Sequence, residues 1–294
     1  MNLDDPSFSR NDDESPLREG LHSVCSGVGV KWSTMVPVLD AFSGWLAANA
    51  AVSIDPNNGA IGIMTGGLGQ SFVYHTAKFM DRMGLSVPAE RRFLARAKHF
   101  HDAPHRVKVE ANVHGIREIS TYVCTPTSIR VAHACLADAG VDAEGIGTME
   151  AIAEVLGITD ADVIATAASV SGDAEEKIYF SVPASRHGWT DVRSAAQLAG
   201  VSDVGWAALS AHRTVLEDRP IRVSVNYRDG GFIPGIKVEI EGVSADLVNA
   251  MLRTDRERQC ANAARVEWGR TEFSSVSFRL TPGSQLTLKT CIEM

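Results

Sequence analysis

The stretch IRVSVNYRDGGFIPGIKVEIE, residues 221–241, decides the fold. Its first eight residues alternate between apolar and polar side chains, which is the pattern of a β-strand with two different faces. Residues 235–241 alternate in the same way, and the glycines at 230 and 231 supply the positive φ that a tight turn requires. The stretch therefore predicts an antiparallel β-hairpin with one apolar face and one polar face.

This hairpin pattern occurs five times along the chain, although the residues themselves do not repeat. Pairs of short alternating runs, each pair joined by turn-forming residues, begin near residues 51, 106, 161, 221 and 273. Their spacing of about 55 residues leaves room for one or two helices in each unit. The sequence therefore predicts ten strands, arranged as five helix-plus-hairpin units.

The segments between the hairpins are predicted to be helical, because their apolar residues recur every three or four positions. Two clear examples are Met35, Val38, Leu39 and Phe42, and Met149, Ile152, Ala153 and Leu156. Helices need an apolar surface to pack on, and a series of antiparallel hairpins can close into a barrel that leaves no strand edge. We therefore predict an α+β fold, a ten-stranded antiparallel β-barrel with an outer ring of helices.

Composition limits the domain organisation and the partners. The 294 residues are 45% hydrophobic and 22% charged, which suits one large domain or two ordinary ones. We expect a flexible acidic tail at residues 1–17 and a single barrel domain at 18–294. With 28 basic and 36 acidic residues, a net charge of −8 and no Lys/Arg-rich block, we expect no nucleic-acid or membrane partner.

Targeting and cysteine signals point to a reduced, cytoplasmic protein. The acidic N-terminus lacks the basic start and apolar run of a signal peptide, and no apolar stretch approaches the roughly 20 residues that span a bilayer. The five cysteines are scattered and form no CxxC pair, so neither a disulfide framework nor a zinc site is suggested. The histidines of HFHDAPH, residues 99–105, indicate an exposed helix end rather than a metal site, because helical zinc ligands usually stand at i and i+4.

The polar faces of the predicted strands carry cations and phenols. In an open sheet such a face is simply exposed to solvent, but in a helix-covered barrel it points into the lumen. A ten-stranded barrel is wider than the eight-stranded kind that side chains fill, so its lumen has room for a ligand. Lys and Arg beside Tyr suit a polyanion such as diphosphate, and burial of those cations without an anion is costly.

Over residues 25–294 the five-unit pattern resembles the ABBA-type aromatic prenyltransferases, whose fold is a barrel of five ααββ repeats. The best local matches are STYVCTP at 120–126, KIYFSVP at 177–183, RVSVNY at 222–227 and LTLKTCI at 286–292. The resemblance implies transfer of an isoprenyl group from an allylic diphosphate, such as dimethylallyl or geranyl diphosphate, to an electron-rich acceptor in natural-product biosynthesis. That acceptor is an aromatic small molecule or a peptide side chain, the latter because the compact chain also resembles the peptide prenyltransferases of cyanobactin pathways.

The resemblance also implies roles for individual residues. A diphosphate clamp falls on Lys177, Tyr179, Arg222 and Lys289. Tyr122 matches a residue that helps to shield the allylic cation. The basic residue of the family's second unit falls on Ser120 here, with Arg117 and Lys108 as nearby substitutes, which implies a rearranged clamp.

The catalytic carboxylate and the cofactors are less closely defined by the resemblance. The acidic residue of the family's early strands falls on Glu110 or Asp55, and such a carboxylate would orient the acceptor or take its proton. No organic cofactor is implied. Mg²⁺ is a hypothesis only, because no Asp-rich metal motif is present and the clamp can itself neutralise a diphosphate.

Two alternatives of a different class stay open. One is a non-catalytic barrel that binds a hydrophobic or anionic small ligand, and the other is an open α+β assembly that mediates subunit contacts. A carrier of neutral ligands has little use for several cations on the inner face, so the basic interior favours the enzyme.

Overall fold

The computed structural model describes residues 15–84, 87–100, 102–170, 172–182, 186–213, 219–283 and 286–294. Two helices followed by two strands recur five times along the chain. The helices are α1 (Ser15–Val28), α2 (Trp32–Leu46), α3 (Gly69–Arg82), α4 (Val87–His99), α5 (Ile129–Asp138), α6 (Ala143–Val155), α7 (Arg186–Leu198), α8 (Asp203–Ser210), α10 (Ala245–Met251) and α11 (Asp255–Glu267). The strands are β1 (Ala50–Asp55), β2 (Ala60–Leu68), β3 (Pro104–Asn112), β4 (Gly115–Ser128), β5 (Asp160–Ser169), β6 (Ala174–Val182), β7 (Ile221–Arg228), β8 (Gly231–Ser244), β9 (Glu272–Leu280) and β10 (Thr287–Glu293).

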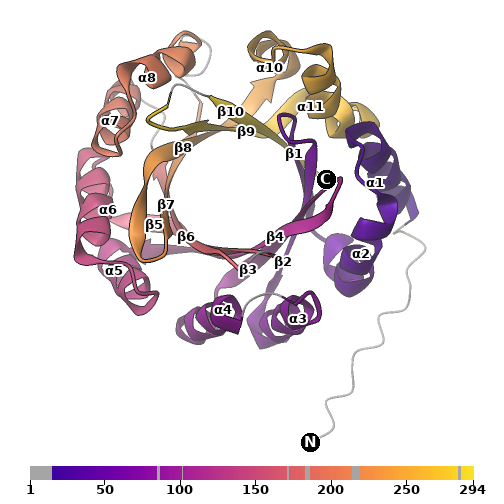
Figure 1. Cartoon of the computed structure of the whole chain (residues 1–294), viewed down its shortest axis with the longest axis horizontal. Helices are drawn as coiled ribbons and strands as arrows, with labels where there is room; N and C mark the ends of the chain where they lie inside the picture. The colour runs from indigo at the N-terminus through magenta and orange to yellow at the C-terminus, as the bar shows by residue number, and fades with distance from the viewer. Residues whose placement is uncertain are drawn as a thin grey trace, which may run out of the picture.

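The ten strands form one closed barrel in which each strand pairs antiparallel with its neighbours in sequence, and β10 pairs with β1. Closure rests on pairs such as Val52 with Ile292 and Ser53 with Cys291. Figure 1 looks down the barrel and shows the helices as an outer ring around the sheet. The predicted fold, a ten-stranded antiparallel barrel of five ααββ repeats, is confirmed.

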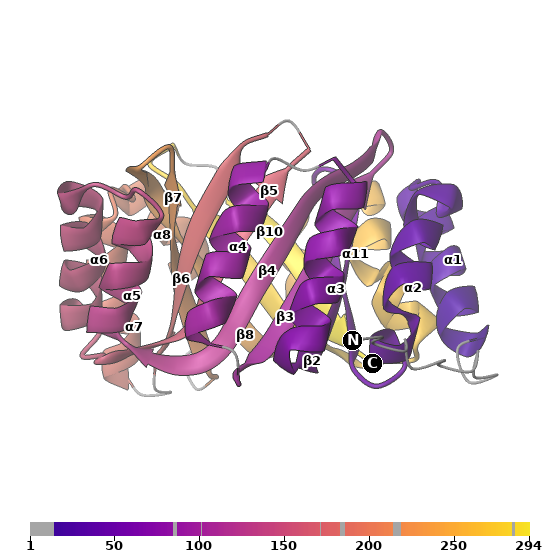
Figure 2. The same ribbon diagram turned by 90° about the horizontal axis from the view of Figure 1, so that it is seen from below.

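The hydrophobic core lies between the sheet and the helices, as the alternating pattern requires. On β7, Val223, Val225 and Tyr227 are buried on the outer face of the barrel. The predicted apolar positions of α2, from Met35 to Phe42, are buried as well. Seen from the side, the helices run along the outside of the strands (Figure 2). The polar face of each strand is thereby left for the lumen.

All five hairpin turns lie at one end of the barrel, because each odd-numbered strand runs toward that end and the next strand returns from it. We call it the turn end. The turn between β7 and β8 needs a positive φ at both Asp229 (53°) and Gly230 (83°). A Cβ at Gly230 would lie 2.8 Å from the carbonyl oxygen of Gly140, so glycine is also required for space. This turn closes the hairpin that the sequence predicted.

Two expectations about local structure were wrong. Helix α1 begins at Ser15, inside the segment expected to be a flexible tail, because Leu17 packs against the core. The remainder of that tail lies outside the described residues. In HFHDAPH, α4 does end at His99, but His105 is fully buried at the start of β3, with Nε2 3.0 Å from the carbonyl oxygen of Phe100. His101 is outside the described residues.

Candidate active site

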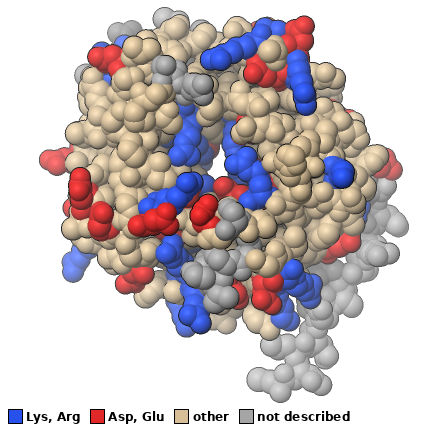
Figure 3. Space-filling model, viewed as in Figure 1, with Lys and Arg blue, Asp and Glu red and all other residues tan. Residues whose placement is uncertain are grey.

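A cavity of about 500 Å³ occupies the lumen toward the turn end of the barrel. Figure 3 shows basic and acidic side chains gathered around the central opening. The cavity is lined by Asp55, Asn58, Lys108, Arg117, Glu118, Tyr122, Ala167, Ser169, Asp173, Glu175, Lys177, Tyr179, Ser224, Asn226, Arg228, Lys237, Ser277, Arg279, Thr287 and Lys289. These residues come from every strand except β2, so closure of the barrel is what assembles the site.

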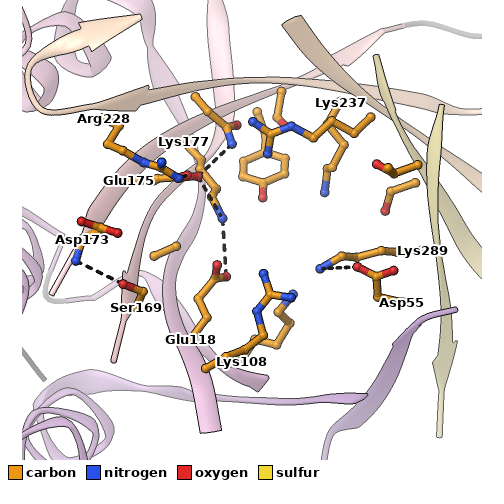
Figure 4. Close-up of a pocket in the computed structure, with 18 of the residues that line it drawn as sticks. Asp55, Lys108, Glu118, Ser169, Asp173, Glu175, Lys177, Arg228, Lys237 and Lys289 are labelled. Carbon is orange, nitrogen blue, oxygen red and sulfur yellow. Dashed lines mark hydrogen bonds and ion pairs between the residues drawn. The ribbon is translucent and has the colours of Figure 1, made fainter. Parts of the chain in front are cut away.

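Four lysines reach the cavity from four strands: Lys108 from β3, Lys177 from β6, Lys237 from β8 and Lys289 from β10. The pairing register explains their position, since Lys177 lies opposite Asn226, and Lys237 opposite Ser224, on the lumen faces of neighbouring strands. In Figure 4 the four lysines converge on the cavity from different walls. Four ammonium groups around one space form a site for an anion with several oxygens.

Each of these lysines already has a carboxylate partner. The four pairs are Lys108 Nζ to Glu110 Oε2 at 3.0 Å, Lys177 Nζ to Glu118 Oε1 at 3.6 Å, Lys237 Nζ to Glu239 Oε2 at 3.0 Å and Lys289 Nζ to Glu110 Oε2 at 2.8 Å. A buried cation without a counter-ion is costly, so these pairs let the barrel fold with a charged interior.

Glu110 stands behind the cavity wall rather than on it. Its side chain is only 2% exposed, and Oε2 accepts hydrogen bonds from both Lys108 and Lys289. Oε1 accepts no hydrogen bond from the described residues, although Arg117 Nε lies 3.5 Å away. Burial acts to raise the pKa of Glu110, but Lys108 and Lys289 overcome it and hold that pKa well below its usual range. Glu110 is therefore an ionised hydrogen-bond acceptor while both lysines are in place.

Asp55 lies on the cavity wall, but the turn between β1 and β2 engages its carboxylate. Its Oδ1 accepts from the backbone N–H of Asn57 (3.1 Å) and of Asn58 (3.3 Å), and its Oδ2 from the Asn58 amide (2.8 Å). Lys289 Nζ is 3.8 Å from Oδ2. This bonding is that of a residue that shapes a turn, so Asp55 lines the cavity with a carboxylate that is already engaged.

Two tyrosines form the aromatic part of the cavity wall. The ring centroids of Tyr122 on β4 and Tyr179 on β6 are 6.3 Å apart. Lys237 Nζ lies 4.8 Å from the centroid of the Tyr179 ring, so the face of that ring already attracts a cation. Burial raises the pKa of Tyr122, which keeps its phenol neutral. These rings are placed to stabilise positive charge inside the lumen.

The structure brings five of the six predicted diphosphate ligands to this cavity: Lys108, Arg117, Lys177, Tyr179 and Lys289. Arg222 is the exception. It faces the lumen near the opposite end of β7, where NH1 donates to Glu239 Oε1 at 3.0 Å and NH2 lies 3.9 Å from Glu241. It is not among the residues that line the cavity.

Sequence reasoning missed Lys237, Arg228 and Arg279 as cavity residues. Alternation could have found them, because each stands at a polar position of a run that is predicted to form a hairpin strand. Arg228 pairs with Glu175, and Lys237 with Glu239. Arg279, which lies directly across from Lys237 on β9, forms no ion pair with a described residue. It is therefore a cation available to a ligand.

The described ranges hold neither a cluster of metal ligands nor a helix suited to cross a membrane. No group of three or more His, Cys, Asp or Glu side chains there is arranged to hold a metal ion. The carboxylates nearest the lysines are engaged by those lysines, so this donor set does not fit Mg²⁺. None of the described helices combines the length and apolar character that crossing a bilayer demands.

Comparison with solved structures identifies the architecture. A 6-dimethylallyltryptophan synthase from Micromonospora olivasterospora, in complex with DMASPP and Trp, superimposes with a TM-score of 0.66 over 96% of this chain and 97% of that one, at 15% identity. The chain has the fold of these prenyltransferases. Two other solved structures have the same fold. A 5-dimethylallyltryptophan synthase from Streptomyces coelicolor superimposes with a TM-score of 0.62 at 10% identity, over 97% of this chain and 98% of that one. The NotF prenyltransferase superimposes with a TM-score of 0.66 at 11% identity, over 97% of this chain and 96% of that one. Scans against protein-family models and curated proteins found no match.

Proposed function

We propose that the protein is a prenyltransferase, which transfers an isoprenyl group from an allylic diphosphate to an electron-rich acceptor. The observation that carries the proposal is the 500 Å³ lumen cavity, where four lysines from four strands stand beside two tyrosine rings. A diphosphate that departs from an allylic carbon needs cations on one side and a cation-stabilising wall on the other. The fold shared with dimethylallyltryptophan synthases supports the same chemistry.

The cations act on the leaving group. As the carbon–oxygen bond of the donor breaks, its electron pair stays with the diphosphate, and negative charge accumulates on the phosphate oxygens. Lys177, Lys237 and Lys289 supply fixed positive charges, and the guanidinium of Arg279 is suited to a bidentate contact. Because these groups are held before the reaction, they stabilise the transition state without reorganisation.

The tyrosines act on the allylic cation, which the acceptor then attacks. The faces of Tyr122 and Tyr179 stabilise the cation and exclude water, which would otherwise capture it. The acceptor attacks the allylic carbon, a new bond forms, and the acceptor loses a proton. The departing diphosphate, whose oxygens carry the negative charge left by the broken carbon–oxygen bond, takes that proton. Glu110 does not line the cavity, and it positions Lys108 and Lys289 from behind the cavity wall.

The molecules bound in one of the similar structures suggest the first substrates to test. The synthase from Micromonospora olivasterospora was crystallised with DMASPP and Trp. We propose dimethylallyl diphosphate as donor and an aromatic acceptor such as tryptophan. A peptide that contains such a side chain is the second acceptor to test.

The proposal is tested by incubating the purified protein with dimethylallyl diphosphate or geranyl diphosphate and a panel of acceptors. The panel contains tryptophan, tryptophan- and tyrosine-containing peptides and small phenols. Mass spectrometry should find an acceptor that gains one isoprenyl group, with release of diphosphate. Tight binding of dimethylallyl thiolodiphosphate with no product from any acceptor would favour the non-catalytic barrel instead. Failure both to bind the analogue and to form product would refute the proposed function.

A further inference from the structure

Glu110 is the only described carboxylate that bonds two of the cavity lysines. Its Oε2 is 3.0 Å from Lys108 Nζ and 2.8 Å from Lys289 Nζ, and the carboxylate itself is buried behind them. The two lysines belong to β3 and β10, which are separated in the barrel by β1 and β2. Glu110 thus holds together two walls of the cavity.

The lumen carries little excess positive charge. Seven lysines and arginines line the cavity, while six carboxylates either line it or bond to its lysines. The two acids behind the wall are Glu110 and Glu239. A polyanion that enters is therefore not drawn to unpaired ammonium groups. It has to share or take lysines that already have a partner.

We propose that Glu110 sets the affinity of the lumen for a diphosphate, because it competes with that ligand for the ammonium groups of Lys108 and Lys289. The inference rests on the proposed function for the identity of the ligand. In the structure the single negative charge of Glu110 is shared by both lysines, which donate to its Oε2. When a diphosphate binds, its oxygens take over part of that neutralisation, and the fixed charge of Glu110 repels them.

Such competition has a use in a transferase. A cavity with several uncompensated cations binds the product diphosphate as strongly as the donor and releases it slowly. When the product leaves, Lys108 and Lys289 regain their full hydrogen bonds to Glu110, so their positive charge is again compensated. Glu110 thus weakens ground-state binding and speeds release.

The test measures binding of inorganic diphosphate by calorimetry to the wild-type protein and to the Glu110→Gln variant. Glutamine keeps the size of the side chain and removes its charge, so Kd is expected to fall about tenfold or more. Without ligand the variant should melt at a lower temperature than the wild type, since two lysines lose their counter-ion. Its melting temperature should rise more than that of the wild type on addition of diphosphate.

Glu176→Gln is the matched control. Glu176 is also a buried glutamate, and its Oε2 pairs with Arg96 NH1 at 3.0 Å, but it lies on the outer face of β6 beneath α4. This variant should lose stability and leave the Kd for diphosphate unchanged. If Glu110→Gln does not fold, Glu110→Asp withdraws the carboxylate from the lysines and should also tighten binding, by less.

The outcomes separate the inference from the function on which it rests. If the wild type binds diphosphate and the Glu110 variants bind it equally well or more weakly, the inference is overturned and the proposed function stands. If Glu176→Gln tightens binding as much as Glu110→Gln, the effect is not local to the lumen and the inference is also overturned. Absence of binding to every protein would refute the diphosphate site itself.

Discussion

Lys289 offers the most direct test of the diphosphate site, by substitution with methionine. It is 34% exposed, it lines the cavity, and its Nζ lies 2.8 Å from Glu110 and 3.8 Å from Asp55. Methionine keeps the length of the side chain and removes only the ammonium group. The change therefore tests the charge rather than the packing of β10.

The magnitude follows from the distances. An ammonium group about 4 Å from one charge on a diphosphate contributes about 4 kcal/mol at an effective dielectric constant of about 20. Glu110 and Asp55 lie as close to that ammonium as the ligand would, so we expect them to offset about half of this contribution. About 2 kcal/mol is left, which corresponds to about a 30-fold rise in Kd. The fold should lose only about 1 kcal/mol, because Glu110 keeps Lys108 as a partner.

The assay is titration of wild-type protein and Lys289→Met with dimethylallyl thiolodiphosphate, together with a thermal melt. Lys78→Met is the control, because Lys78 makes a cation–π contact with Tyr74 on the outer helix α3 and does not reach the lumen. An unchanged Kd for Lys289→Met, with the same value for Lys78→Met, would show that the cavity lysines do not bind the diphosphate.

Three further predictions address the fold and the site. Arg222→Ala should weaken binding of the same analogue by only about 1 kcal/mol, which is about a fivefold rise in Kd, because Arg222 acts through Glu239 and does not line the cavity. An effect as large as that of Lys289→Met would place Arg222 in the clamp. Burial lowers the pKa of His105, so as the pH falls this side chain takes up a proton more readily in the unfolded state than in the folded state. The free energy of unfolding should therefore fall as the pH drops below about 6.5. Urea titrations at several pH values should show that the free energy of unfolding falls less steeply with pH in His105→Asn than in the wild type. An equal pH dependence in the two proteins would contradict this account. Turnover should be unchanged in EDTA, because the carboxylates that could hold Mg²⁺ are engaged by lysines. Activity that is lost in EDTA and restored by Mg²⁺ would contradict this prediction.

The fold was predictable because its signals are local. Alternation along 221–228 and the glycine of the following turn define a hairpin without knowledge of any distant residue. Repetition of that signal, with helical segments between the repeats, leaves closure as the arrangement that covers every edge. The start of α1 escaped prediction because Leu17 stands among polar residues and acquires its apolar surroundings only in the folded protein.

The charge pairs of the site were only partly predictable. Lys108 and Glu110 are two residues apart on one strand, so alternation alone places them on the same face. The second bond of Glu110 goes to Lys289, 179 residues away, and depends on how far neighbouring strands are staggered around the closed barrel. Alternation does not determine that stagger. The sequence therefore indicates which side chains enter the lumen and leaves their partners undetermined.

This difference changes what the buried cations imply. From the sequence, lysines inside a barrel point to an anionic ligand, since an uncompensated ammonium group is too costly to bury. In the structure Glu110, Glu118 and Glu239 provide that compensation, so the buried lysines do not by themselves require a ligand. The position of the ion pairs then indicates an anion site, because the lysines project into the cavity while Glu110 lies behind two of them. An arrangement made only for stability has no need to present its cations to an open space, whereas one that exchanges a carboxylate for a phosphate does.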